Sequence, residues 1–290
     1  MTARITRRAT LAGVSGLCML AGTSLASGAL ARTATPRVIS VGGSLTEIVY
    51  ALGAGEQLVG VDTTSAYPEA ATRLPKVGYL RSLSAEGLLS LRPTLLIAAA
   101  QAGPPVALRQ VESAGTPLVR GDEEYSYAAV RRNVATIGRA LDRDAATVVL
   151  AARLDGEWAA ATAAVPRTGT RPRALFVLAH TGANVQISGT GTAAHAMLEL
   201  AGARNAAEGF AGYRPLTAEG AVAAAPDFIV ATRQGVEASG GVDRLLQRPG
   251  LALTPAGRAR RVVAPEASFL LGFGPRLPGA VAELAAAFAA

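Results

Sequence analysis

One tyrosine, close to two cations in the sequence, is the residue best suited to bind a metal. Tyr79 is followed two residues later by Arg81 and is preceded three residues earlier by Lys76. A nearby positive charge favours the phenolate over the phenol. Tyrosinate is a hard oxygen donor and one of the protein ligands known for haem iron. The alternative is a half-buried tyrosine whose ring packs against neighbours and whose hydroxyl has a hydrogen-bond partner.

A short motif occurs twice in the chain. Residues 83–87 read LSAEG and residues 216–220 read LTAEG, and a proline and a short apolar run follow each copy. The offset between the glutamates, Glu86 and Glu219, is 219 − 86 = 133 residues, and the prolines that follow have the same offset. One structural unit is therefore present twice, which predicts two lobes.

The glutamates of this repeat are expected to begin helices. Ser84 and Thr217 are residue types that cap helices, and a glutamate two residues later lies where the helix dipole favours an anion. This accounts for both glutamates as ordinary first-turn acids. Helical spacing also places Glu86 on the outward face and Leu88 on the inward face. Two matched exposed carboxylates, Glu86 and Glu219, are suited to contact a symmetric partner.

The first 31 residues have the features of an export signal. Arginines at positions 4, 7 and 8 precede an apolar run at 11–30, and small residues at 29 and 31 form a cleavage site. The pair Arg7-Arg8 resembles a twin-arginine signal. An uncleaved membrane anchor is the alternative. We expect cleavage, which leaves a mature chain that begins near residue 32.

The composition argues against disulfide bonds and against nucleic acid binding in the mature protein. Cys18 is the only cysteine and lies inside the apolar run, after Leu17 rather than after the small residue that a lipoprotein site requires. The mature chain is then expected to have no disulfide. The formal net charge of +7 includes three signal arginines, so 7 − 3 = +4 remains. Aromatic residues are few, at 4%, and no basic stripe is present, so nucleic acid binding is not expected.

Short β-branched runs alternate with helical segments along most of the chain. Strands are expected at 37–41, 58–61, 95–99, 117–120, 174–178, 228–232 and 261–264, and helices at 44–52, 127–141, 144–165, 193–200, 218–225 and 278–288. This alternation predicts an α/β protein with two lobes, each a mostly parallel sheet flanked by helices. We place the lobes at 32–142 and 167–290. One helix at 143–166, capped by Asp144 and about 33 Å long, is expected to join them.

The turn at Gly42-Gly43 and the two histidines are further candidate site residues. The Gly42-Gly43 turn is a weak signal for an anion-binding site, and Ser44 to Glu47 reads as a capping box in which Glu47 satisfies a backbone donor. His180 follows the strand at 174–178, at the edge of the sheet where ligands of such folds bind. It either faces Tyr79 as a second ligand or hydrogen-bond donor, or lies in water. His195 is expected on a solvated helix face.

These motifs together resemble the haem-binding periplasmic proteins of bacterial ABC-type haem importers. This branch belongs to a wider group of receptors that also bind cobalamin and ferric siderophores. The resemblance covers nearly the whole mature chain and is carried by Gly42 to Glu47, Tyr67-Pro68, Leu74-Pro75, Val77-Gly78-Tyr79, Leu83 to Gly87, Gly103-Pro104-Pro105 and Gly272 to Arg276 (GFGPR). The Gly-Tyr pair followed by Leu-Ser-x-Glu-Gly is specific to the haem branch.

The resemblance implies a class III periplasmic binding protein-like fold that holds ferric haem edge-in between its lobes. It implies Tyr79 as the axial ligand, Arg81 as the partner of the phenolate, and His180 as an additional ligand from the second lobe. Glu86 and Glu219 are implied to dock on an ABC permease dimer with its ATPase. The protein is then expected to be a periplasmic monomer. For the haem propionates, position alone points to Arg233 or Arg276.

Two other functions remain open at this point. A cobalamin or ferric-siderophore receptor would share the lobes and the paired glutamates. A secreted hydrolase is the alternative from another class. The sequence has no Gly-x-Ser-x-Gly motif, no metal-spaced histidine pair and no phosphate-binding glycine motif, and its two histidines leave few general bases. We therefore expect a binding protein and not an enzyme.

Overall fold

The computed structural model describes residues 36–166, 171–179 and 185–290, which belong to one compact unit, Thr35–Ala290. The expected export signal, with Cys18, and the candidate ligand His180 lie outside these described residues. Within them, no helix is both long and apolar enough to cross a membrane.

The N-terminal lobe is built on a four-stranded sheet in the order β2-β1-β5-β6. All three strand pairs are parallel, and the strands run over Val38–Val41 (β1), Leu58–Val61 (β2), Leu95–Ala98 (β5) and Leu118–Arg120 (β6). Every residue of β1 is buried because helices cover both faces of the sheet. The four strands predicted for this lobe are confirmed.

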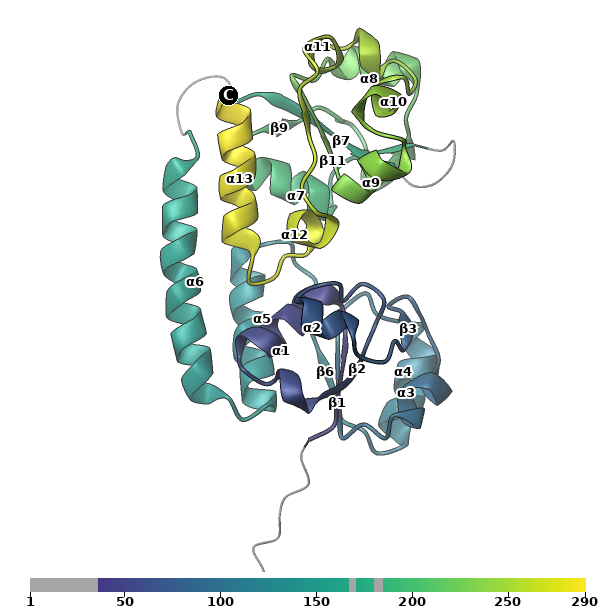
Figure 1. Cartoon of the computed structure of the whole chain (residues 1–290), viewed down its shortest axis with the longest axis vertical. Helices are drawn as coiled ribbons and strands as arrows, with labels where there is room; N and C mark the ends of the chain where they lie inside the picture. The colour runs from purple at the N-terminus through teal and green to yellow at the C-terminus, as the bar shows by residue number, and fades with distance from the viewer. Residues whose placement is uncertain (1–35, 167–170, 180–184) are drawn as a thin grey trace, which may run out of the picture. The chain divides into compact units, whose positions relative to one another are not determined.

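Four helices flank this first sheet. They are α1 (Gly43–Ala51), α3 (Ala85–Ser90), α4 (Pro105–Ser113) and α5 (Tyr127–Ala140). Figure 1 shows α1 and α5 on one side of the sheet and α3 and α4 on the other. The lobe also contains η1 (Gly55–Gln57), α2 (Glu69–Thr72) and the two-stranded hairpin of β3 (Gly78–Tyr79) and β4 (Ser82–Leu83).

The C-terminal lobe has a mixed sheet in the order β10-β8-β7-β11-β12, with β9 paired to β7. Its strands run over Arg173–Leu178 (β7), Gln186–Ser188 (β8), Arg204–Asn205 (β9), Tyr213–Pro215 (β10), Phe228–Ala231 (β11) and Val262–Val263 (β12). The pairs of β7 with β11 and β9, and of β11 with β12, are parallel, whereas those of β8 are antiparallel. The expectation that this lobe repeats the first is therefore only partly right.

Side chains alternate between two cores along the central strands of this sheet. Phe176 of β7 and Val230 of β11 belong to one buried cluster, whereas Val177 and Ile229 belong to another. The first face is covered by α7 (Ala193–Leu200), α12 (Ala267–Leu271) and α13 (Leu277–Ala289). The second is covered by α8 (Ala218–Ala224), α9 (Arg233–Ala238), α10 (Val242–Leu246), η2 (Leu251–Leu253) and α11 (Pro255–Arg258).

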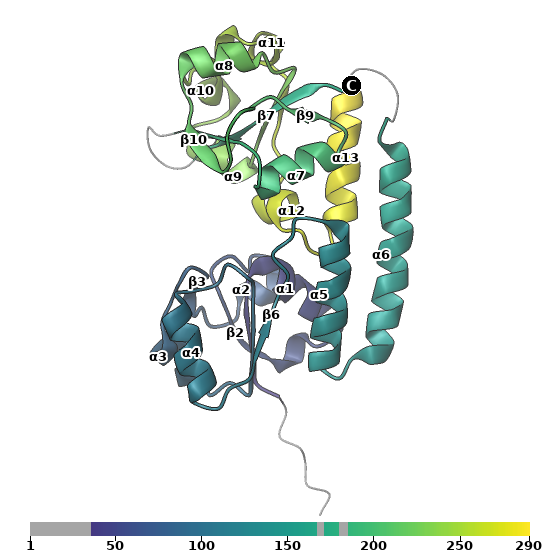
Figure 2. The ribbon, with the colours of Figure 1, turned by 180° about the vertical axis from the view of Figure 1, so that it is seen from behind.

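The long helix α6 (Asp144–Ala164) connects the two lobes. It packs against α5 of the N-terminal lobe and against α13 of the C-terminal lobe, and Figure 2 shows it alongside both. Leu150 and Leu154 are buried in the same apolar cluster as residues of both sheets, so the lobes share one core. The predicted cap was wrong, because the N-cap residue is Arg143 and no side chain caps the helix.

Candidate ligand-binding site

A cavity of about 400 Å³, open to solvent, is lined by residues of both lobes. This volume lies in the range of small-molecule sites. The N-terminal lobe contributes Gly42, Gly43, Ser44, Thr63, Thr64, Ala66, Leu80, Ala99 and Gln101, and the C-terminal lobe contributes Gln234, Glu266, Ala267, Ser268, Leu271 and Gly272. Several of these residues follow directly on β1, β2 or β5, and ligands of parallel sheets bind beyond the carboxyl ends of the strands.

The floor of the cavity is a turn whose backbone donors are already paired. The amide of Gly42 donates to Asp62 Oδ1 (2.8 Å), and the amide of Gly43 donates to Thr64 Oγ1 (3.2 Å). Buried Asp62 also accepts a hydrogen bond from Ser65 Oγ (2.8 Å). The prediction of an anion site at this turn is wrong because these amides have internal partners. They fix the shape of the cavity instead.

Gly42 also allows the first helix to approach the third strand of the sheet. Its φ of +111° is one that side chains disfavour. A Cβ at this position would lie 2.8 Å from the Cβ of Ala99. A larger residue at position 42 would therefore strain the backbone and push the two walls of the cavity apart.

The hairpin of β3 and β4 carries Tyr79 and Arg81. The strands pair antiparallel, with Tyr79 opposite Ser82, which leaves Leu80 and Arg81 as the turn. Leu80 lines the cavity, while Tyr79 is 45% exposed and Arg81 is exposed. Tyr79 is the last residue of the strand β3. Its backbone position is thus fixed by pairing rather than free.

Only one of the two cations expected to act on Tyr79 remains available. The ammonium of Lys76 donates to the backbone carbonyl oxygens of Ala71 (3.0 Å) and Ser65 (3.4 Å), so it is held away from that role. Within residues 36–166, 171–179 and 185–290, the side chain of Arg81 has no ion pair or hydrogen bond of its own. Arg81 is therefore the cation that can act on a ligand or on the phenol.

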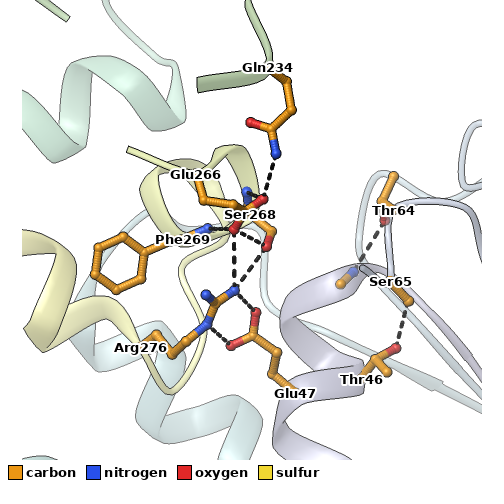
Figure 3. A network of polar contacts seen from close by, with 10 residues as sticks. Thr46, Glu47, Thr64, Ser65, Gln234, Glu266, Ser268, Phe269 and Arg276 are labelled. Carbon is orange, nitrogen blue, oxygen red and sulfur yellow. Dashed lines mark hydrogen bonds and ion pairs between the residues drawn. The ribbon is translucent and has the colours of Figure 1, made fainter. Parts of the chain in front are cut away.

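Glu47 has a different role from the one predicted. Helix α1 begins at Gly43 with Gly42 as its N-cap and no side-chain cap, so Ser44 lies inside the first turn and Glu47 is too far along to reach the N-cap amide. Glu47 instead accepts two hydrogen bonds from Arg276, at 2.9 Å from Nε and 2.5 Å from Nη2. Figure 3 shows this pair between α1 and the loop that precedes α13. The capping-box prediction is wrong.

Arg276 makes further contacts with one residue of each lobe. Its Nη2 donates to Ser268 Oγ (2.8 Å), and its guanidinium lies 4.0 Å from the centroid of the Tyr67 ring. Burial alone would lower the pKa of Arg276, but the hydrogen bonds to Glu47 and the charges of Glu47 and Glu266 together raise that pKa. Burial raises the pKa of Glu47, even beside this partner. Arg276 fastens the two lobes together, which leaves it poorly suited to hold a propionate.

Glu266 forms the polar rim of the cavity on the C-terminal side. Its carboxylate caps α12 by accepting hydrogen bonds from the amides of Ser268 (2.8 Å) and Phe269 (2.9 Å), and it also accepts one from Gln234 Nε2 (3.2 Å). Burial alone would raise the pKa of Glu266, but these hydrogen bonds and that of the Ser268 hydroxyl lower it below its usual value. The carboxylate therefore stays charged. Arg233, the other propionate candidate, is exposed at the start of α9.

The paired motifs of the repeat have the expected local structure. The side chains of Ser84 and Thr217 accept hydrogen bonds, each at 3.0 Å, from the amides of Gly87 and Gly220. The glutamates lie in the first turns of α3 and α8, and both are exposed. The predicted caps and the outward direction of these glutamates are confirmed.

The histidines offer no metal site that the structure describes. His195 is half-buried, and its Nδ1 lies 3.3 Å from the side-chain nitrogen Nδ2 of Asn205, so the expectation of a solvated face is wrong. His180 belongs to 180–184, outside the described residues. In the part of the chain that is described, no three His, Cys, Asp or Glu side chains gather as a metal site. That leaves the phenol of Tyr79 as the metal ligand to be tested.

Comparisons with known proteins point to one family. A family model described as periplasmic binding protein matches residues 38–267. A solved structure of the periplasmic haem-binding protein BhuT in complex with two haems is 51% identical, with a TM-score of 0.83, over 87% of this chain and 97% of BhuT. The structure of the periplasmic haem-binding protein RhuT from Roseiflexus sp. RS-1 is 42% identical, with a TM-score of 0.84, over 88% of this chain and 98% of RhuT.

Curated relatives are more distant. An uncharacterised ABC transporter substrate-binding lipoprotein of Bacillus subtilis, YvrC, is 28% identical over 86% of this chain and 78% of its own length. A vitamin B12-binding protein of Pectobacterium carotovorum is 35% identical, but over only 42% of this chain and 45% of its own length.

Proposed function

The chain belongs to the periplasmic binding protein family, and on that premise we propose that it captures ferric haem between its lobes for an ABC importer. It is an exported binding protein and not an enzyme, since the proteins it matches are binding proteins. The proposal extends this to the ligand, to the residues that hold it and to the partner that receives it.

The hairpin tip carries the proposal. Leu80 lines the cavity between the lobes, and the residues on either side of it are an exposed tyrosine and an arginine without an acidic partner among the described residues. Tyr79 would bind the ferric iron as a phenolate, a known haem ligand. Arg81 would stabilise that phenolate through its charge. The 51% identity to a haem-binding protein supports haem as the ligand.

Other parts of the cavity suit a porphyrin held by its faces. Leu80 and Leu271 contribute apolar surface from opposite lobes, and burying the apolar porphyrin face against them is favourable at about 25 cal/mol per Å². His180 remains the proposed second ligand from the C-terminal lobe. The variant His180→Ala tests whether the iron has one protein ligand or two. If His180 binds the iron, the variant should change the visible spectrum of the haem complex; if Tyr79 is the only protein ligand, the spectrum should stay the same.

Delivery is proposed to use the two exposed glutamates. Glu86 and Glu219 begin matched helices in the two lobes, and each would pair with arginines on one half of a permease dimer. The proposed organisation is an export signal at 1–31 that is removed, lobes at 32–142 and 167–290 with the joining helix at 143–166, and a periplasmic monomer as the working form.

The test of the haem proposal compares ligands as well as variants. Three mature proteins are titrated with ferric haem, cobalamin and a ferric siderophore: the wild type, Tyr79→Ala and the control Tyr127→Phe. Tyr127 is a suitable control because its hydroxyl donates to Asp155 between α5 and α6. The proposal predicts that haem binds wild type and the control, and that Tyr79→Ala loses most of that affinity.

Cobalamin is the second candidate, because vitamin B12-binding proteins match part of the chain. Cobalamin requires no anionic oxygen ligand, and a siderophore already saturates its iron. Tight cobalamin or siderophore binding that Tyr79→Ala leaves unchanged would therefore contradict the haem proposal and favour this alternative.

A further inference from the structure

The excess positive charge of the mature protein is concentrated in one segment of the C-terminal lobe. Residues 239–265 contain five arginines and one acidic residue, Asp243, so their net charge is 5 − 1 = +4. The expected mature chain, residues 32–290, has the same net charge, 7 − 3 = +4, so all its other residues together are neutral. The five arginines are Arg244, Arg248, Arg258, Arg260 and Arg261. A surplus collected in this way gives one surface a positive potential.

This segment belongs to the helix layer that covers the second face of the C-terminal sheet. It contains α10, η2 and α11, and η2 packs against α8, α10 and α11. Figures 1 and 2 both show α8, α10 and α11 together at one end of the lobe. Arg260 extends from the end of α11 to Asp243 of α10, with 2.5 Å between Nη2 and Oδ1. The one acidic residue of the segment therefore offsets only one of its arginines.

The other four arginines keep their charge at the surface. Arg244, Arg258 and Arg261 are exposed, and Arg248 is half-buried. None of the four forms an ion pair with any residue in the ranges 36–166, 171–179 and 185–290. Their charges therefore add to one another over this layer, where they attract an anionic partner.

Apolar side chains are exposed on the same layer. Leu253 of η2 is 60% exposed, and Val222 of α8 is 45% exposed. Gly250 allows the two elements to approach closely, since a Cβ at this position would lie 2.5 Å from the carbonyl oxygen of Ala218 in α8. Binding to a membrane surface depends on the apolar area that is buried and on attraction to anionic lipids. This layer offers both.

The position of Glu219 indicates which way the layer faces. Glu219 lies in the first turn of α8, next to Ala218, on which Gly250 packs. In the proposed function this glutamate docks on a permease that is embedded in the membrane, so the helix layer around it approaches the bilayer. Only this orientation rests on the proposed function, whereas the charge and the exposure of the layer do not.

We propose that the layer of α8, α10, η2 and α11 is a docking surface for a bilayer that contains anionic phospholipids. The guanidinium groups bind the headgroup phosphates through their charge and their paired N–H donors. Leu253 enters between the headgroups. Bound in this way, the protein reaches the permease by moving along the membrane, with Glu219 on the side that meets it.

The test measures how much mature protein sediments with vesicles, without haem. One set of vesicles contains equal parts of phosphatidylglycerol and phosphatidylcholine, and the other contains phosphatidylcholine alone. Arg244→Gln/Arg258→Gln removes two exposed charges from the layer. The control, Arg109→Gln/Arg139→Gln, removes two exposed charges from α4 and α5 of the N-terminal lobe, so the two variants have the same net charge.

We expect the layer variant to bind the anionic vesicles about thirtyfold more weakly than wild type, since each arginine near an anionic membrane contributes about 1 kcal/mol. The control variant should bind as wild type does, and 1 M salt should release wild type, because the screening length is then about 3 Å. Leu253→Ser should also weaken binding, whereas Val148→Ser, at a similarly exposed apolar residue of α6, should not.

The outcomes separate this inference from the haem proposal. Equal binding by the two arginine variants overturns the docking surface, because net charge and not this layer would then determine binding. Absence of wild-type binding to the anionic vesicles overturns it too, as does binding only to vesicles that contain the permease, since the partner would then be a protein. Haem titration tests the proposed function independently: both arginine variants should bind haem as wild type does, and failure of wild type to bind haem leaves the vesicle result unchanged.

Discussion

Two charged side chains that are 229 residues apart in the chain fasten the lobes to each other. Glu47 is only 5% exposed and accepts both of its side-chain hydrogen bonds from Arg276. A buried ion pair adds little over an apolar contact of the same shape, but removing one partner leaves the other charge uncompensated. Removing Glu47 leaves the Arg276 guanidinium with only its longer ion pair to Glu266 (3.7 Å) and its hydrogen bond to Ser268 (2.8 Å).

Glu47→Ala is predicted to lower the free energy of unfolding by roughly 3 kcal/mol, measured by urea unfolding of the mature protein. Glu56→Ala is the matched control, because it removes a glutamate that pairs with Arg143 (3.3 Å) at the surface, where an ion pair contributes about 0 to 1 kcal/mol. Equal losses in the two variants would contradict the fastening role of Glu47.

Glu266 provides a prediction for the pH dependence of stability. Hydrogen bonds lower its pKa in the folded state below the unfolded value of 4.5, although burial opposes them. The stabilisation is then present above pH 4.5 and is lost as the pH falls through the folded pKa. Glu47 has the opposite sign. Its raised pKa means that protonation of Glu47 favours the folded state, and this stabilisation is lost as the pH rises through the folded pKa.

Glu266→Gln should therefore be less stable than wild type at neutral pH and approach it on acidification. Urea unfolding of both proteins between about pH 3 and pH 7 measures this difference. Glu237→Gln, at an exposed glutamate of α9, controls for the loss of one carboxylate. If the difference in free energy of unfolding between wild type and Glu266→Gln is the same or larger at acidic pH, the hydrogen bonds to Glu266 do not favour its charged form.

At the scale of elements, the helix α6 determines how the two lobes are connected. One side of it is buried between α5 and α13, with Leu154 fully buried, while Val148 on the same helix is 69% exposed. A buried leucine truncated to alanine loses its transfer free energy and leaves a cavity. The exposed valine makes no such contribution.

Leu154→Ala is predicted to destabilise the protein by about 2 to 5 kcal/mol. Val148→Ala, the control on the same helix, should change stability by less than about 0.5 kcal/mol. Thermal and urea unfolding give both values. A single unfolding transition is expected in each case, because the core is continuous through both lobes, and a separate transition for one lobe would contradict that continuity.

The sequence allowed the long or apolar elements to be predicted and did not allow the short polar ones. The four strands of the first sheet, the helices α5 and α6, and the caps at Ser84 and Thr217 follow from periodicity and local chemistry. Strands β8, β9 and β10 were missed because they have two or three residues each and include Gln186, Arg204 and Arg214. Such short strands form because they pair with a neighbouring strand of the sheet, and the local sequence does not indicate this pairing.

The same distinction holds for the site. Tyr79 and Arg81 were proposed from a local pairing of a phenol with a cation, and Leu80 between them lines the cavity. The contact of Glu47 with Arg276 was missed, because nothing local links residues so far apart.

At the scale of the whole molecule, the two exposed glutamates are predicted to act on a partner and not on the ligand. Glu86→Arg and Glu219→Arg should each strongly reduce haem transport by the importer reconstituted in liposomes, because an arginine would meet like charges on the permease. Haem affinity should be unchanged. Glu112→Arg and Glu237→Arg reverse exposed glutamates elsewhere on the two lobes and serve as matched controls. Equal transport by all four variants would contradict the docking role.

The most direct test of the central claim is the visible spectrum of ferric haem bound to the mature protein, recorded for wild type and for Tyr79→Phe. Phenylalanine keeps the ring and removes the oxygen, so only ligation is lost. The account predicts a tyrosinate-type high-spin spectrum for wild type that Tyr79→Phe does not show. The same spectrum in both proteins would contradict Tyr79 as the iron ligand, and no haem binding by wild type would contradict the account as a whole.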